Sequence, residues 1–218
     1  MATVRKDTIS GYQKIDAWEN YFNSLNCDLI TVDRDGLKLT ININNLAEIK
    51  FTFRSYGDTD FFVDMAYTLN GSTVTGPSVL AYTTTVIVVY TDTLFFIQVS
   101  DYSNRRFCYL YESINDEDYI GYRGANAENQ GFYPINSFNL LNVATSTSYV
   151  HGARLNYTKQ GLNYIDYTSD ALFSIGTSTM FFEDPNFIAC STIAADLVIT
   201  FNGATYYSLS TNTLVEID

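Results

Sequence analysis

The side chains that most often make and break bonds are sparse in this sequence. His151 is the single histidine and lies in an expected strand, where a lone histidine packs far more often than it acts as a base. The sequence contains no Gly-x-Ser-x-Gly motif and no glycine-rich phosphate loop. Cys27, Cys108 and Cys190 are far apart and form no Cys-x-x-Cys pair, so we expect buried free thiols and neither a disulfide nor a zinc site.

Carboxylates could still act in pairs, because glycoside hydrolysis needs only two of them on opposite sides of a bond. The densest acidic groups are Asp116-Glu117-Asp118 and Asp58, Asp60 and Asp64. Neither group lies in a recognisable motif, and some clustering is expected among 24 carboxylates. The segment Asp33-Arg34-Asp35-Gly36 lacks the third ligand and the distant glutamate of a calcium loop. We therefore expect solvated turns, no catalytic residue, no metal and no cofactor; a polysaccharide-degrading enzyme is the least favoured alternative.

Sugar binding would need exposed aromatic rings that stack on pyranose faces and amides that bind hydroxyl groups. One predicted loop combines both kinds of side chain, and it is the candidate site for a host-surface glycan or a protein partner. Its residues are Tyr119, Tyr122, Asn126, Asn129, Phe132 and Tyr133. The same aromatic residues could equally anchor a long loop onto the body of the protein, and no linear pattern separates these alternatives.

The charge balance limits the kinds of partner. The chain has 218 residues, with 12 Lys and Arg against 24 Asp and Glu, so its formal net charge is −12. Nucleic acid is a poor partner for such a chain, because phosphate binding needs basic patches. The longest apolar run, Thr85–Tyr90, is far shorter than the about 18 residues that a membrane helix needs. The N-terminal residues lack the apolar segment of a signal peptide, so we expect the chain to fold in the cytoplasm where it is made.

One segment has a helical period and predicts a helix over residues 11–26. Its apolar residues recur at spacings that place them on one helix face. These residues are Tyr12, Ile15, Trp18, Phe22 and Leu25. Amphipathic helices usually cover their own fold, so the favoured interpretation is domain core. The alternative is a docking face for a partner or neighbour, with residues 1–26 forming an N-terminal arm and helix.

After Cys27 the sequence alternates between strand and turn patterns almost to its end. Leu37–Ile43 and Glu48–Arg54 alternate apolar with polar residues at a period of two. Hairpin turns are predicted at Asp35-Gly36, at Asn70-Gly71 and at Asn202-Gly203. The apolar runs within residues 79–90 and 93–100 predict strands covered on both faces.

These patterns predict an all-β fold. We expect an antiparallel β-sandwich or barrel-like β domain over residues 27–218, with one short N-terminal α-helix. Residues 113–147 are rich in Asn, Gly, Ser and acidic residues. This composition indicates a long loop or a break between subdomains.

The C-terminal sequence reads as an apolar strand, an Asn-Gly turn, a Tyr-Tyr step, a turn of small residues and a final Leu-Val strand. Its segments are Phe187–Thr192, Leu197–Gly203, Thr205–Leu209 and Thr211–Val215. This pattern resembles structural proteins encoded in bacteriophage tail and virion gene clusters, and Leu94–Val99 and Phe107–Glu112 resemble them more loosely. The pattern commonly has Lys after Asn-Gly, whereas this chain has Ala204, which changes only an expected turn position.

The resemblance implies a structural component of a phage particle, often present in many copies and without enzymatic activity. Such a protein would belong to the tail, baseplate or fibre, or would decorate the capsid. It would assemble in the bacterial host cytoplasm with other virion proteins, and it would form homo-oligomers. Abundant tyrosine and scarce lysine suit protein–protein interfaces. A carbohydrate- or receptor-binding module on the virion is the alternative.

Overall fold

The computed structural model divides the chain into two compact units. Residues 5–129 form the first unit, and residues 1–4 with 130–218 form the second. The division falls inside residues 113–147, and the helix belongs to the same unit as the strands that follow it. The structure describes residues 2–10, 15–56, 60–69, 72–80, 83–100, 106–114, 116–125, 139–142, 148–150, 153–155, 173–174, 184–189, 197–201, 204–210 and 213–217.

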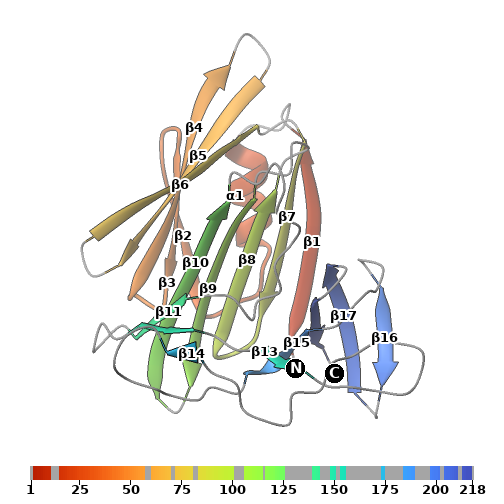
Figure 1. The fold of residues 1–218 in the computed structure, drawn as a ribbon. Helices are drawn as coiled ribbons and strands as arrows, with labels where there is room; N and C mark the ends of the chain where they lie inside the picture. The colour runs from red at the N-terminus through yellow and green to blue at the C-terminus, as the bar shows by residue number, and fades with distance from the viewer. Residues whose placement is uncertain are drawn as a thin grey trace. The chain divides into compact units, whose positions relative to one another are not determined.

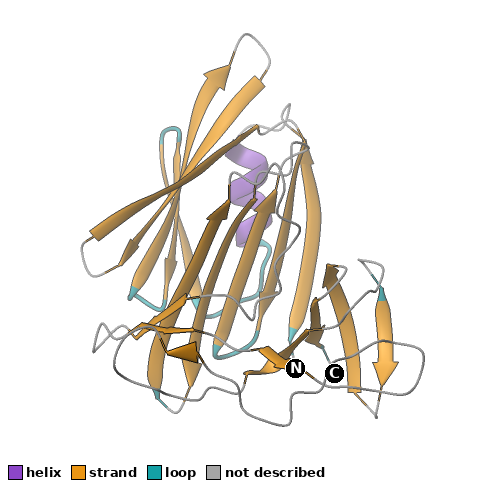
Figure 2. Ribbon diagram, in the orientation of Figure 1, coloured by secondary structure: helices purple, strands orange, loops and turns teal. Residues whose placement is uncertain are grey.

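Two sheets and one helix make up the first unit (Figures 1 and 2). One sheet has the strand order β2-β3-β4-β5-β6, and the other contains the order β1-β7-β8-β9-β10. Their elements are β1 (Thr3–Ser10), α1 (Ile15–Asn23), β2 (Ile30–Asp35), β3 (Lys38–Ile43), β4 (Ala47–Tyr56), β5 (Asp60–Leu69), β6 (Ser72–Leu80), β7 (Thr83–Tyr90), β8 (Leu94–Ser100), β9 (Arg106–Ile114) and β10 (Glu117–Ala125). The all-β antiparallel prediction is confirmed, and the open sheets form a sandwich-like arrangement rather than a closed barrel.

The hairpins of the first sheet follow from their turn residues. Gly36 adopts a φ of 58° between β2 and β3, a left-handed conformation that glycine reaches without steric cost. Asn44 and Asn45, with φ of 47° and 55°, reverse the chain between β3 and β4. Asparagine tolerates this region better than other residues that carry a side chain. Leu69 of β5 pairs with Ser72 of β6, as the Asn-Gly hairpin signal predicts.

Alternation along β3 and β4 separates a buried face from a solvent face. Leu39, Ile41 and Ile43 are fully buried, and in β4 Ile49 and Phe51 lie opposite them. The intervening polar residues are exposed or half-buried. Burying one face of an antiparallel sheet fixes its register, because a slip of one residue would expose the whole apolar set.

The second sheet is covered on both faces, as its continuous apolar runs predict. Every residue of β8 from Leu94 to Val99 is buried, and so is every residue of β9 from Phe107 to Glu112. The β7–β8 turn is held by the Thr91 hydroxyl, which accepts hydrogen bonds from the backbone amides of Thr93 and Leu94 at 3.1 and 3.0 Å. Such a side-chain bond replaces backbone partners at a turn.

The helix α1 packs against the buried face of the first sheet. Trp18 is fully buried, and its ring centroid lies 5.3 Å from that of Phe51 and 5.5 Å from that of Phe53 in β4. On its other side the Tyr21 hydroxyl donates a 2.9 Å hydrogen bond to the Arg5 carbonyl of β1. The helix therefore lies between the β2–β6 sheet and β1, as Figure 1 shows.

Three details differ from the sequence predictions. Residues 3–10 form a strand, β1, where a plain N-terminal arm was expected. Residues 117–125 also form a strand, β10, although they fall in the predicted loop region of residues 113–147. Val79 and Leu80 end β6 rather than beginning the strand predicted within residues 79–90, because a bulge between Asp64 and Ala66 lets the pairing of β5 and β6 continue to Leu80.

The second unit contains shorter strands. A five-stranded sheet has the order β13-β15-β18-β17-β16, in which β13 and β15 pair in parallel. Its strands are β13 (Ala153–Leu155), β15 (Asp184–Ala189), β16 (Val198–Phe201), β17 (Ala204–Ser210) and β18 (Thr213–Glu216), while β11 (Asn139–Asn142), β12 (Ser148–Val150) and β14 (Phe173–Ser174) pair among themselves. The described residues include no helix long and apolar enough to span a membrane.

Candidate functional site

A polar surface lies on the solvent face of the β2–β6 sheet, which we call the outer face. Its side chains alternate with the buried ones, and they are exposed or half-buried. Hydroxyl groups and amides are interspersed with both signs of charge. The outer face consists of Thr31, Asp33, Lys38, Thr40, Asn42, Glu48, Lys50, Thr52, Arg54, Phe62, Asp64, Ala66, Thr68, Thr73, Thr75 and Ser78.

Contacts within and between strands hold several side chains of the outer face in place. The Asn42 amide donates to the Asp33 carboxylate at 2.6 Å between β3 and β2. The Lys50 ammonium lies 2.6 Å from the Glu48 carboxylate on β4. Such pairs contribute modestly to stability, because their charges stay hydrated. Their consequence for binding is that much of the outer face is already ordered before any partner arrives.

Arg54, Asp64 and Ser78 form a polar network across three strands of the outer face. The Arg54 guanidinium binds both oxygens of the Asp64 carboxylate, and the Ser78 hydroxyl donates to the same carboxylate. The guanidinium also lies over the Phe62 ring, 5.4 Å from its centroid. The hydrogen bond from Arg54 is the main cause that holds the pKa of Asp64 below its usual range.

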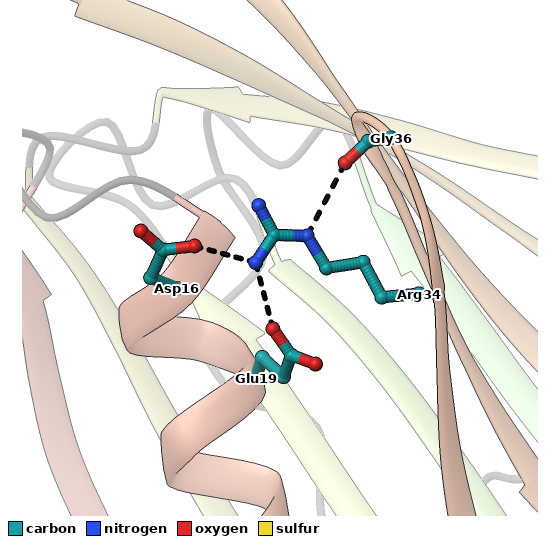
Figure 3. Close-up of polar contacts among 4 residues, drawn as sticks. All are labelled: Asp16, Glu19, Arg34 and Gly36. Atoms are coloured by element: carbon teal, nitrogen blue, oxygen red, sulfur yellow. Dashed lines mark hydrogen bonds and ion pairs between the residues drawn. The ribbon is translucent and has the colours of Figure 1, made fainter.

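A second ion cluster joins the helix to the β2–β3 hairpin. Figure 3 shows one nitrogen of the Arg34 guanidinium between two carboxylates of α1, at 2.5 Å from Asp16 and 2.7 Å from Glu19. The Arg34 Nε atom donates to the Gly36 carbonyl at 3.3 Å. The two carboxylates are one helical turn apart, so a single arginine reaches both. This cluster is exposed and orients the helix rather than forming a binding site.

Inside the first unit, polar groups link the two sheets. The Tyr111 hydroxyl of β9 accepts a 2.7 Å hydrogen bond from the Asn44 amide and donates one of 2.7 Å to the Asp118 carboxylate. Burial and the bond to Asp118 raise the pKa of Tyr111 to about 12, so the phenol stays protonated in the physiological range. The sequence predicted a solvated turn for the acidic group that contains Asp118. That prediction is wrong for Asp118, because its carboxylate belongs to a structural network.

The predicted helical stripe lies in the core of the first unit. Ile15, Trp18, Phe22 and Leu25 are all buried within the chain itself, which agrees with the favoured interpretation from sequence. Docking of this face to a partner would require the helix to leave the sheet that it covers. Tyr12 lies outside the described residues.

The predicted glycan or partner loop is only partly described. Tyr119 and Tyr122 lie in β10, with Tyr119 paired to Glu112 and Tyr122 paired to Tyr109. The other four residues, Asn126, Asn129, Phe132 and Tyr133, lie outside the described residues.

Several single-residue predictions have different outcomes. Cys27 and Cys108 are buried and are not in a disulfide bond, as predicted, whereas Cys190 and His151 lie outside the described residues. Among the described residues no group of three or more His, Cys, Asp or Glu side chains could hold a metal ion. Asp64 forms an ion pair with Arg54, whereas Asp58 of the same acidic group lies outside the described residues.

Sequence reasoning missed the two arginine clusters. A signal for the Arg54 network was present, because the hairpin at Asn70-Gly71 and the alternation in Glu48–Arg54 together predict which residues share the outer face. The Arg34 cluster had no such signal, since it depends on where the helix packs against the sheet.

Comparison with protein-family models finds no match, and searches of the curated proteins and of the solved structures find none either. The function is therefore argued from the fold and from the surfaces described above. The outer face offers ordered polar groups on a sheet of five strands, which is an arrangement suited to contact with another macromolecule.

Proposed function

We propose that this protein is a structural component of a phage particle, in the tail, baseplate or fibre or as a capsid decoration. It acts through protein–protein contacts with other virion proteins, and no bond is made or broken on it. The single observation behind the phage assignment is the C-terminal pattern, an apolar strand, an Asn-Gly turn, a Tyr-Tyr step and a Leu-Val strand. The segments of that pattern coincide with β16, β17 and β18.

The outer face supports a role based on contact. Its hydroxyl, amide and charged side chains offer hydrogen-bond donors and acceptors over five strands. The Arg54–Asp64–Ser78 network holds charged groups in one geometry, so a partner loses little entropy in ordering them. A rigid sheet with preformed polar contacts suits a protein that docks into an assembly.

The proposal is tested directly by measuring which proteins the purified phage particles contain. Particles banded from a lysate of the phage that carries this gene are digested, and their peptides are quantified by mass spectrometry against a major capsid protein. We expect peptides of this chain in the particles at many copies, and labelling with antibodies under the electron microscope would show which part of the particle holds them. A chain abundant in the lysate but missing from intact particles would overturn the proposal.

Docking through the outer face is tested with a charge reversal. Lys50→Glu changes the face without touching the Arg54 network, and Lys6→Glu on β1 is the matched control because it makes the same charge change on an exposed residue of the other sheet. We expect only Lys50→Glu to lower incorporation into particles. Equal incorporation of both variants would exclude the outer face while leaving the particle assignment intact.

A further inference from the structure

The edges of the described sheets differ in how they resist pairing with another chain. An unprotected edge strand presents unpaired N–H and C=O groups, so natural proteins guard edges with charge, proline, bulges or short length. The β1 edge carries exposed Arg5, Lys6 and Asp7, and the β2 edge carries Asp33 and Asp35. These two edges are protected by charge.

Two further edges are protected in other ways. The β6 edge contains Gly76 and Pro77 at the bulge opposite Met65, and proline cannot donate to a neighbouring strand. The β13 edge is three residues long, contains Arg154 and has a shift in register. Each of these features interrupts the regular ladder that an added strand would need.

The β16 edge is short, at four residues, but it carries no charge, no proline and no bulge in its pairing with β17. It lies at the end of the five-stranded sheet and pairs with β17 through Val198–Tyr207 to Phe201–Ala204. Its sequence, Val-Ile-Thr-Phe, contains no charge, glycine or proline. Val198 is 65% exposed and the preceding Leu197 is 44% exposed, so this edge also presents apolar side chains to solvent.

The neutral region extends well beyond this one strand. From Leu197 to Val215 the sequence contains no charged residue, and this span includes all of β16 and β17 and most of β18. The chain as a whole carries a net charge of −12, so two copies repel each other over most orientations. An uncharged edge allows two copies to approach without like charges in contact.

We propose that β16 is a homotypic interface, at which two copies of the chain pair antiparallel and continue one sheet across both. A two-fold axis perpendicular to the sheet passes beside Ile199, so that Ile199 of one copy lies opposite Ile199 of the other. Val198 of each copy then lies opposite Thr200 of the other, and these exposed residues share one face of the joined sheet. This isologous contact closes as a dimer. A charged edge would select a partner strand of opposite charge. An edge without charge can pair with the same edge of a second copy, because no like charges are brought together.

This interface rests on the proposed function, in which the chain assembles in several copies. The partner is a second copy of the chain, and the contact is the β16 edge. A strand of four residues supplies few backbone hydrogen bonds. The isolated dimer is therefore expected in the micromolar range, with avidity adding to it inside a particle.

The test compares the oligomeric mass of three full-length proteins by sedimentation over a concentration series. We expect the wild-type chain to form dimers of twice 24.6 kDa. Val198→Lys places a charge on the edge, and we expect the dimer dissociation constant to rise at least about tenfold. Leu37→Lys is the matched control, because Leu37 is also an exposed apolar residue, at 54%, but lies in the β2–β3 turn. We expect it to dimerise like the wild type.

A second variant and a second measurement guard against misfolding. Thr200→Lys changes another exposed residue of β16, and hydrogen exchange reads the amides of Val198–Phe201 directly. In the wild type we expect protection of these amides that increases with protein concentration. A wild-type chain that stays monomeric, or a dimer unaffected by both β16 variants, would overturn the inference. Neither result bears on whether particles contain the chain, so failure here is distinct from failure of the proposed function.

Discussion

At the scale of single residues, Trp18 is the largest fully buried side chain among the described residues. It is fully buried and contacts the rings of Phe22, Phe51 and Phe53 at centroid distances of 6.2, 5.3 and 5.5 Å. Trp18→Ala leaves a cavity between helix and sheet. We expect the free energy of unfolding to fall by about 3–5 kcal/mol, measured by urea denaturation with circular dichroism.

An exposed apolar residue provides the comparison for this prediction. Leu37→Ala removes a side chain that is 54% exposed, so the free energy of unfolding should stay within about 0.5 kcal/mol of the wild type. Equal losses for the two variants would mean that the helix does not pack as described.

Asp64 is the residue whose ionisation is most clearly coupled to a neighbour on the outer face. Its folded pKa lies below the unfolded value of about 3.9, so its contribution to stability is present above that pH and is lost as the pH falls through the folded pKa. Arg54→Gln removes the main cause, and we expect the pKa of Asp64 to rise, as read from carboxyl carbon shifts by NMR.

Both side chains of this ion pair are partly exposed, so the effect of Arg54→Gln on overall stability is expected to be small. Lys50→Gln is the control, because it removes a positive charge from the same face while the ion pair of Lys50 is with Glu48. If Lys50→Gln raised the pKa of Asp64 as far as Arg54→Gln does, the low pKa of Asp64 would come from the summed positive charge of the outer face and not from the hydrogen bond with Arg54.

At the scale of elements, β6 and β9 approach each other closely at Gly76. A Cβ atom on Gly76 would lie 3.0 Å from the Phe107 ring and 3.2 Å from the Met65 carbonyl oxygen. Gly76→Ala should therefore lower the free energy of unfolding by about 1–3 kcal/mol through overpacking. Chemical denaturation of the purified variant measures this loss.

A double-mutant cycle tests the cause. Phe107→Leu removes ring atoms that the new Cβ would meet, so Gly76→Ala should cost at least about 0.5 kcal/mol less in that background. Purely additive losses would show that the backbone contact with Met65, and not the ring, makes the position intolerant.

Much at the scale of elements could be predicted from sequence, because local chemistry determines it. The turn at Gly36 and the alternation of Leu39, Ile41 and Ile43 need only backbone preferences and a period of two. The strand β1 could not be predicted, since Thr3–Ser10 mixes charged and apolar residues. Its strand conformation depends on pairing with β7, which is distant in sequence.

The same limit applies to the candidate surfaces. The polar outer face follows from alternation along β3 and β4, so its composition could be inferred. The link from Arg34 to Asp16 and Glu19 could not, because it requires the position of α1 on the sheet. The acidic segment at residues 116–118 was predicted as solvated turn, yet Asp118 binds Tyr111 because a hairpin brings β10 against β9.

At the scale of the whole molecule, net charge governs how copies meet. A dimer that forms through the uncharged β16 edge brings together two chains of net charge −12. Added salt screens their repulsion, since the Debye length falls from about 30 Å at 0.01 M to about 8 Å at 0.15 M. We expect the dimer dissociation constant to decrease over this range, measured by sedimentation velocity.

An interface built on ion pairs would respond in the opposite way, because salt weakens exposed charge pairs. A dissociation constant that increases with salt would therefore place the contact on a charged surface such as the outer face. The Leu37→Lys protein should follow the wild-type trend, slightly shifted by its smaller negative charge.

The enclosed Trp18 has an optical consequence, because it is the only indole among 18 tyrosines. An indole shielded from water emits at shorter wavelength than a hydrated one, and nearby phenols transfer excitation to it. The colour of this emission should therefore report release of α1 from its sheet, separately from any loss of strands. The natural protein thus carries its own fluorescent probe for one movement, without an attached dye.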